Sequence, residues 1–148
     1  MSEFSRIIFV AEEGNSRAPL AAEILKKMKL KKPLEILSRG LVVLFPEPLN
    51  QKMEAVMISN GLATEGFRSK ELSSEDFSEH TLIICLDQKQ QRKILEKFDQ
   101  ANDENVHVLT ELVGDELEII DPYGGTLQAY GLCYETLVAS IRKLVNLL

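Results

Sequence analysis

The sequence contains few cysteines, no tryptophan and no long apolar run. Its two cysteines, Cys85 and Cys133, are far apart and form no Cys-x-x-Cys pair, so neither a zinc site nor a disulfide framework is expected. No apolar segment approaches the roughly 20 residues that a bilayer-spanning helix needs. The first residues, MSEFSR, also lack the charged-then-apolar layout of a signal peptide. The sequence therefore predicts a cytoplasmic protein with no membrane partner.

Basic residues are outnumbered as well. The chain has 17 Lys and Arg against 23 Asp and Glu, a formal charge of −6. It therefore has no basic surplus with which to neutralise the phosphates of a nucleic acid or an anionic membrane. His80 is expected to be a surface residue and His107 a strand residue, so neither is expected to bind a metal. No cofactor, metal or nucleic-acid partner is implied.

The residues that are present indicate an α/β fold. At 148 residues, 45% of them hydrophobic, the chain is long enough to bury one substantial core. Short apolar runs suited to buried parallel strands alternate with segments of helical periodicity. We expect strands at 6–11, 34–38, 81–86 and 106–109, and helices that begin near Pro19, Leu49 and Asp87. We also expect a final helix that carries the apolar residues from Tyr130 to Leu148, a capped turn at 73–76, and a solvated acidic face at 111–118. The predicted fold is a single three-layer domain, residues 1–148, with an open parallel sheet of about four strands and helices on both faces.

A candidate anion-binding loop follows the first strand. The segment FVAEEGNSRAPLAAEIL, residues 9–25, leads from an apolar strand through a turn of small residues into a helix. Such a loop turns several backbone N–H groups toward one point, where the helix dipole adds positive potential. Arg17 could donate two parallel hydrogen bonds to phosphate oxygens. The alternative is a tight strand–helix turn with a surface arginine. Because ligands of open α/β sheets bind beyond the carboxyl ends of the strands, we expect Asp87 and the Asp121 loop near this turn.

The segment resembles the phosphate loop of the low-molecular-weight protein tyrosine phosphatase family. In that family a cysteine, five further residues and an arginine follow the first strand, and serine, proline, an apolar residue and Ala-Glu come next. This chain keeps a Gly-Asn pair, Arg17, Pro-Leu and Ala22-Glu23. The late Asp-Pro-Tyr loop of the family is matched at 121–123, and NGLATEGFRSKELSSEDF and LIICLDQKQQRKI match its middle segments. The resemblance spans nearly the whole chain and implies the fold of that family.

The resemblance also implies an activity and a set of site residues. The activity is hydrolysis of phosphate monoesters, phosphotyrosine in particular, through a phosphocysteine. Arg17 would bind phosphate, Asp121 would be the general acid, and Ala11 occupies the position of the nucleophile. The phosphate-binding loop would comprise Glu12, Glu13, Gly14, Asn15, Ser16, Arg17 and Ala18, and the substrate slot Leu44, Phe45 and Tyr123. The implied ligands are a phosphorylated protein, a small phosphate monoester or an inorganic oxyanion.

The family pattern is broken at the catalytic position. Counting back six positions from Arg17 leads to Ala11, which has no nucleophilic group, and the serine that follows the arginine in the family is Ala18 here. The Gly-Asn pair also lies one position nearer the arginine than usual. Cys85 and Cys133 are expected to be core residues that cannot supply the missing thiolate.

Two glutamates in the loop are a further departure from the family pattern. Glu12 and Glu13 place carboxylates beside a site for a dianion, where like charges would weaken binding. We therefore expect both side chains to point outward to water.

Two explanations for Ala11 remain open from the sequence. In the first, it replaces a native cysteine by design, which preserves the five-residue spacing. In the second, the nucleophile was lost naturally, which Ala18 and the shifted Gly-Asn pair favour. The leading hypothesis is a tyrosine phosphatase-type protein that is inactive or nearly so. The alternative is a pseudophosphatase that binds an anion or a partner without catalysis. A third hypothesis is an interaction domain whose pocket is filled by its own side chains.

Overall fold

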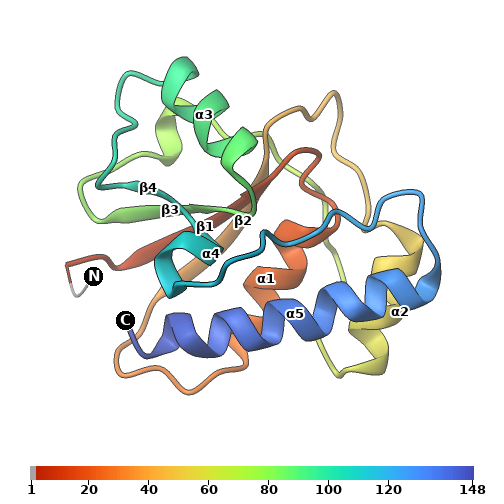
Figure 1. Ribbon diagram of the computed structural model, residues 1–148. Helices are drawn as coiled ribbons and strands as arrows, with labels where there is room; N and C mark the ends of the chain where they lie inside the picture. The colour runs from red at the N-terminus through yellow and green to blue at the C-terminus, as the bar shows by residue number, and fades with distance from the viewer. Residues whose placement is uncertain (1–2) are drawn as a thin grey trace.

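The computed structural model describes residues 3–148, and in them a four-stranded parallel sheet lies between two layers of helices (Figure 1). The strand order is β2-β1-β3-β4. The strands are β1 (Arg6–Ala11), β2 (Glu35–Gly40), β3 (Thr81–Cys85) and β4 (Val106–Val108). The helices are α1 (Arg17–Lys26), α2 (Gln51–Ser59), α3 (Gln88–Lys97), α4 (Leu109–Val113) and α5 (Leu127–Val145), with a 3-10 turn η1 at Ser74–Asp76.

The two central strands are the most apolar ones. Strands β1 and β3 are buried almost along their whole length, because their side chains are apolar on both faces of the sheet. Strand β1 pairs with β2 up to the contact between Ala11 and Gly40, and with β3 up to the contact between Val10 and Cys85. The carboxyl ends of β1, β2 and β3 therefore lie level at one edge of the sheet.

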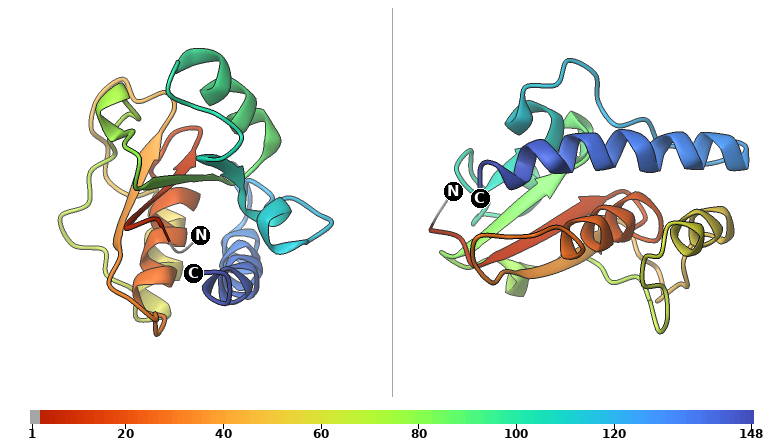
Figure 2. Two further views of the ribbon diagram at one scale, coloured as in Figure 1. Left: turned by 90° about the vertical axis from the view of Figure 1, so that its left-hand side faces the viewer. Right: turned by 90° about the horizontal axis from the view of Figure 1, so that it is seen from below.

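Two hydrophobic layers attach the helices to the sheet. On one face, Ile7 and Phe9 of β1 belong to a core shared with α1, α2, α4 and α5. On the other face, Ile8 and Val10 belong to a second cluster that includes Ile94 of α3. Figure 2 shows the sheet between the α1–α5 layer and α3. The predicted α/β class, the three layers and the four parallel strands are confirmed.

Helix α4 corrects the prediction for residues 106–118. Leu109 was expected to end a strand, but it opens a short helix that ends at Val113 and has Gly114 as its C-cap. Leu109 is buried and Leu112 packs on the same core, so tertiary packing turns part of the expected solvated face inward. Helix α5 begins at Leu127, because the Thr126 hydroxyl accepts a hydrogen bond from the Ala129 N–H and caps the helix there.

Within residues 3–148 no helix is both long enough and apolar enough to cross a membrane. Cys85 and Cys133 are both free and buried, as expected for core residues.

Candidate functional site

The connection from β1 to α1 is folded tightly against the end of β2. Gly14 has a φ of 76°, which residues with a side chain rarely adopt. A Cβ on Gly14 would lie 2.6 Å from the Gly40 nitrogen, and a Cβ on Gly40 would lie 2.7 Å from the Glu13 carbonyl. The two backbones are therefore in direct contact, and only glycine fits at both positions.

Backbone N–H groups from other parts of the chain hold carbonyl groups of this connection by hydrogen bonds. The Glu12 carbonyl accepts a hydrogen bond from the Leu41 N–H at 2.8 Å, and the Asn15 carbonyl accepts one from the Asn50 N–H at 3.0 Å. Among the described residues, the backbone N–H groups of 12–17 have no backbone acceptor. A run of free N–H groups at the start of a helix, together with the helix dipole, forms an anion-binding arrangement.

Arg17 lies at the centre of the site. It is the first residue of α1 and is only 3% exposed. Its Nη1 donates to the Ile119 carbonyl at 2.9 Å, and its Nη2 lies 3.6 Å from Asp87 Oδ2 and 3.7 Å from Asp121 Oδ2. The partners of Arg17 lie at the β3–α3 junction and in the α4–α5 segment. Together they hold the guanidinium in one orientation.

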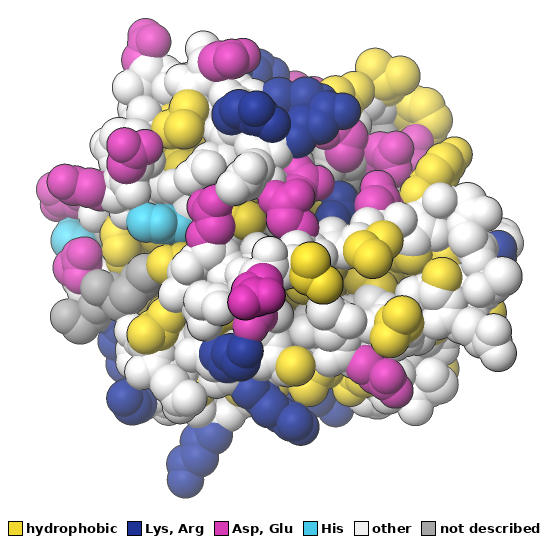
Figure 3. Space-filling model, in the orientation of Figure 1, with side chains coloured by type: hydrophobic (Ala, Val, Ile, Leu, Met, Phe, Trp, Pro, Cys, Tyr) yellow, Lys and Arg dark blue, Asp and Glu magenta, His cyan; other side chains and the backbone are white. Residues whose placement is uncertain are grey.

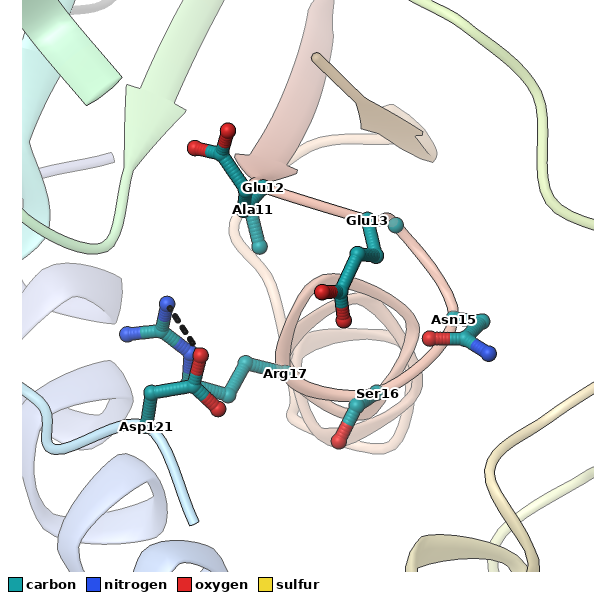
Figure 4. Close-up of a pocket in the computed structure, with 8 residues that line it drawn as sticks. Ala11, Glu12, Glu13, Asn15, Ser16, Arg17 and Asp121 are labelled. Atoms are coloured by element: carbon teal, nitrogen blue, oxygen red, sulfur yellow. Dashed lines mark ion pairs between the residues drawn. The ribbon is translucent and has the colours of Figure 1, made fainter. Parts of the chain in front are cut away.

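Asp121 completes the pocket on the side of the α4–α5 segment. Its Oδ1 accepts a hydrogen bond from the Tyr123 N–H at 3.1 Å, and its side chain is 48% exposed. The same pocket is lined by Asp121 and by every residue from Ala11 to Arg17 (Figure 4). The structure thus brings Ala11, the rest of the loop, Arg17 and Asp121, all named from the sequence, into one pocket.

No thiolate is available in this pocket. The Ala11 methyl group points into the loop at the end of β1 (Figure 4). Burial raises the pKa of the Cys85 thiol well above its usual range. Burial also raises the pKa of Cys133 to about 11, although the nearby Arg17 lowers it. Both thiols are therefore neutral at physiological pH, and a neutral thiol is a poor nucleophile.

The two glutamates of the loop take different directions. Glu12 points away from the pocket and pairs with Lys93 of α3 at 2.8 Å, as expected. Glu13 is exposed to solvent, also as expected, although its carboxylate lies over the N-terminal end of α1 (Figure 4). The pKa of Glu13 is raised, first by partial burial and then by the carboxylates of Asp121, Glu12 and Glu47, while Arg17 lowers it. The raised pKa of Glu13 therefore has partial burial as its first cause, and the crowding of negative charge at the loop adds to it.

Four other predicted site residues lie outside this pocket. Leu44 and Phe45, between β2 and α2, are 88% and 62% exposed, and Tyr123 is 72% exposed. None of them lines the pocket described above, so they do not form an enclosed slot in this structure. Ala18 is buried in the core as the second residue of α1, and it therefore does not belong to the loop surface.

The sequence did not indicate the residues that hold the loop from behind. Gly40, Leu41 and Asn50 contact the loop backbone, and each comes from a distant part of the chain. The glycine that ends the second strand was the available signal, because a glycine there allows close backbone approach. In residues 3–148 there is no cluster of three or more His, Cys, Asp or Glu side chains placed to hold a metal ion.

Comparisons with known proteins identify the family. A family model described as low molecular weight phosphotyrosine protein phosphatase matches residues 6–148. The chain belongs to this family. The low molecular weight protein-tyrosine-phosphatase PtpB of Staphylococcus aureus is 30% identical over 143 residues, which are 97% of this chain and 99% of that protein.

Two solved structures of phosphatases have the same fold. The low molecular weight protein tyrosine phosphatase from T. tengcongensis is 27% identical, with a TM-score of 0.89 and coverage of 97% of this chain and 99% of that one. The YwlE arginine phosphatase from Geobacillus stearothermophilus is 26% identical, with a TM-score of 0.86 and coverage of 96% and 91%. Proteins similar to this low molecular weight phosphatase family member are thus named for two phosphorylated residues, tyrosine and arginine.

Proposed function

We propose that this chain is a pseudophosphatase, which binds phosphorylated ligands on the 11–17 loop and does not hydrolyse them. The observation that carries the proposal is Ala11. It occupies the end of β1, where the family resemblance requires a cysteine, and it points into a loop whose N–H groups remain free. A methyl group cannot attack phosphorus, so no phosphoenzyme can form at this position.

The proposed binding mode uses groups that the pocket already contains. The N–H groups of 12–17 and the α1 dipole would hold phosphate oxygens, and Arg17 would donate from its fixed guanidinium. Asp121 would lie beside the atom that links the phosphoryl group to its carrier. Leu44, Phe45 and Tyr123 would close over that carrier once it binds, since all three are exposed near the β2–α2 and α4–α5 segments.

The proposed ligands are a phosphorylated protein, a small phosphate monoester or an inorganic oxyanion. The proposed location is the cytoplasm, and the two free cysteines fit its reducing conditions. A second candidate function is that of a phosphatase in which Ala11 stands for a native cysteine. It is favoured by the retained pair of Arg17 and Asp121 in one pocket, which catalysis would use as phosphate binder and general acid.

An Ala11→Cys variant separates the two candidates. Hydrolysis of p-nitrophenyl phosphate is measured for the unaltered chain, for Ala11→Cys and for Ala11→Cys with Asp121→Asn, and Thr136→Cys on the exposed face of α5 is the matched control. The unaltered chain and the control are expected to show no turnover. Turnover in Ala11→Cys that falls with Asp121→Asn would support the catalytic scaffold, and no turnover in either would support a binding-only protein.

The proposal has a clear contrary result. If the unaltered chain hydrolysed the substrate and lost this activity on Cys133→Ala, another thiol would act as the nucleophile, and the pseudophosphatase proposal would be wrong.

A further inference from the structure

The loop carries more negative charge than an anion site needs. Arg17 is the cation in contact with the pocket, and it already faces the carboxylates of Asp87 and Asp121. The carboxylate of Glu13 lies over the same loop (Figure 4). Figure 3 shows Asp and Glu side chains gathered on this face of the molecule, between α3 and α5. A ligand bound here therefore meets both an anion-binding loop and an acidic rim.

The direction of Glu13 is set by the backbone behind it. A Cβ on Gly40 would lie 2.7 Å from the Glu13 carbonyl, and one on Gly14 would lie 2.6 Å from the Gly40 nitrogen. The loop therefore has no room to rotate toward β2. This contact holds the backbone on the carboxyl side of the Glu13 Cα, and the hydrogen bond from the Leu41 N–H to the Glu12 carbonyl holds it on the amino side. The Glu13 side chain lies over the loop, on the side of the pocket, as Figure 4 shows.

Glu12 differs from Glu13 in its charge partner. The Glu12 carboxylate is 2.8 Å from Lys93 Nζ, so its charge is balanced by a cation on α3. Among the described residues, no ion pair is found for Glu13. The charged groups that act on it are Asp121, Glu12, Glu47 and Arg17, and three of these four are acidic. Glu13 is thus an unbalanced charge at the mouth of the loop.

This arrangement discriminates between two kinds of phosphorylated ligand. A phenolic phosphate ester brings two negative charges and an uncharged ring, so its phosphate meets the Glu13 carboxylate without compensation. A phosphoryl group attached to a cationic nitrogen group brings a positive charge next to the phosphate. A guanidinium in that place could donate hydrogen bonds to a carboxylate. Repulsion of one ligand and attraction of the other both increase the difference in affinity.

We propose that Glu13, together with Asp121, selects phosphoryl groups carried on a cationic nitrogen group, as in phosphoarginine, over phosphate esters of phenols. This inference rests on the proposed function, because it specifies the ligand class of the same loop. Glu13 acts here as a specificity-determining residue. The chemistry is shared by a free phosphorylated guanidine and by a phosphorylated arginine side chain of a protein.

Titration calorimetry with two small probes tests the inference. Phospho-L-arginine and phospho-L-tyrosine are titrated at neutral pH into the unaltered chain, Glu13→Gln and Glu104→Gln. The last removes the same charge from an exposed turn before β4, at the opposite edge of the sheet. The unaltered chain and Glu104→Gln are expected to bind phosphoarginine at least about five-fold more tightly than phosphotyrosine. In Glu13→Gln this ratio is expected to fall several-fold, mainly because phosphotyrosine binds more tightly.

The possible failures can be told apart. If the ratio is the same in the unaltered chain and in Glu13→Gln, or if phosphotyrosine is the preferred ligand of the unaltered chain, the inference is wrong while the proposed function stands. If none of the three proteins binds either probe, the proposed function fails and the inference fails with it. A phosphopeptide with arginine phosphorylated, compared with the free amino acid, then distinguishes a protein ligand from a small one.

Discussion

Arg17 is the residue on which the contacts of the site converge. Its guanidinium donates to the Ile119 carbonyl and faces two carboxylates while being almost fully buried. The sequence could predict this role because the arginine stands two positions before a helix-opening proline, at the end of the loop that follows the first strand. The sequence could not predict the direction of Glu13, which depends on a backbone contact with Gly40, 26 positions after Gly14.

Replacing Arg17 should affect stability and ligand binding together. Arg17→Ala leaves the Ile119 carbonyl without its donor and is expected to lower the free energy of unfolding by about 1–3 kcal/mol and to abolish oxyanion binding. Arg17→Lys keeps the charge without the planar fork, so binding should stay at least about ten-fold weaker. Urea unfolding and calorimetry measure both effects, with Arg142→Ala on the exposed face of α5 as the control. Undiminished binding by Arg17→Ala would contradict the assignment.

A pair of glycine substitutions tests the loop geometry. Gly14→Ala combines a φ of 76° with a contact of 2.6 Å to the Gly40 nitrogen, so it is expected to destabilise the protein by about 1–3 kcal/mol. Gly131→Ala, inside α5, meets no atom within 4 Å and should stabilise by about 0.5–1 kcal/mol. Thermal unfolding of both variants gives the comparison. Equal effects would mean that the loop is not packed against β2 as described.

Among the secondary-structure elements, α3 links the sheet to the site through its first residues. The Asp87 carboxylate accepts a hydrogen bond from the Gln90 N–H at 2.9 Å, and the Gln90 side chain accepts one from the Asp87 N–H at 3.2 Å. The sequence predicted that a helix begins near Asp87, and the capping box of Asp87 and Gln90, three residues apart at the end of an apolar strand, fixes that start. Helix α4 was missed because only five residues form it, too few for a periodic pattern.

Two substitutions of Asp87 separate capping from charge. Asp87→Ala removes the cap and should cost about 0.5–2 kcal/mol of stability. Asp87→Asn keeps a cap of similar quality and should stay within a few tenths of a kcal/mol, while removing one carboxylate that faces Arg17. Asparagine should therefore tighten phosphate binding at nearly unchanged stability, as urea unfolding and calorimetry would show. Weaker phosphate binding by the stable asparagine variant would mean that the Asp87 charge orients Arg17 rather than competing with phosphate.

At the scale of the whole molecule, the contacts that attach the C-terminal helix α5 to α4 predict how the stability of the protein changes at low pH. Asp115, just after α4, accepts hydrogen bonds from Lys143 and Ser140 of α5, which lower its pKa. A lowered folded-state pKa means that the stabilisation is present above the unfolded pKa and is lost as the pH falls through the folded value.

Asp115→Asn should therefore be less stable than the unaltered chain at neutral pH. The difference should shrink below about pH 4, the ordinary range of an aspartate. Urea unfolding of both proteins at neutral pH and below about pH 4 measures the difference in stability in each range. A difference that persists unchanged at low pH would show that packing, and not the charge of Asp115, holds α5 against α4.

The fold as a whole was predictable, because alternating apolar strands and amphipathic helices leave few topologies open. The site was predictable as a set of residues but not as a charge distribution. The order of the loops along the chain is enough to predict that Arg17 and Asp121 belong to the site. The ion pair between Glu12 and Lys93, and the lack of such a partner for Glu13 among residues 3–148, become visible only in the packed structure.

The 11–17 loop is proposed to bind an oxyanion although Ala11 stands where the family pattern has its cysteine. The most direct measurement is a crystal structure of the unaltered chain soaked in tungstate, an analogue of the phosphoryl group. Tungstate is expected on the backbone N–H groups of 12–17 and on the Arg17 guanidinium, with the Glu13 carboxylate displaced from above the loop. A loop that stays empty, with Glu13 still lying over α1, would contradict this proposal.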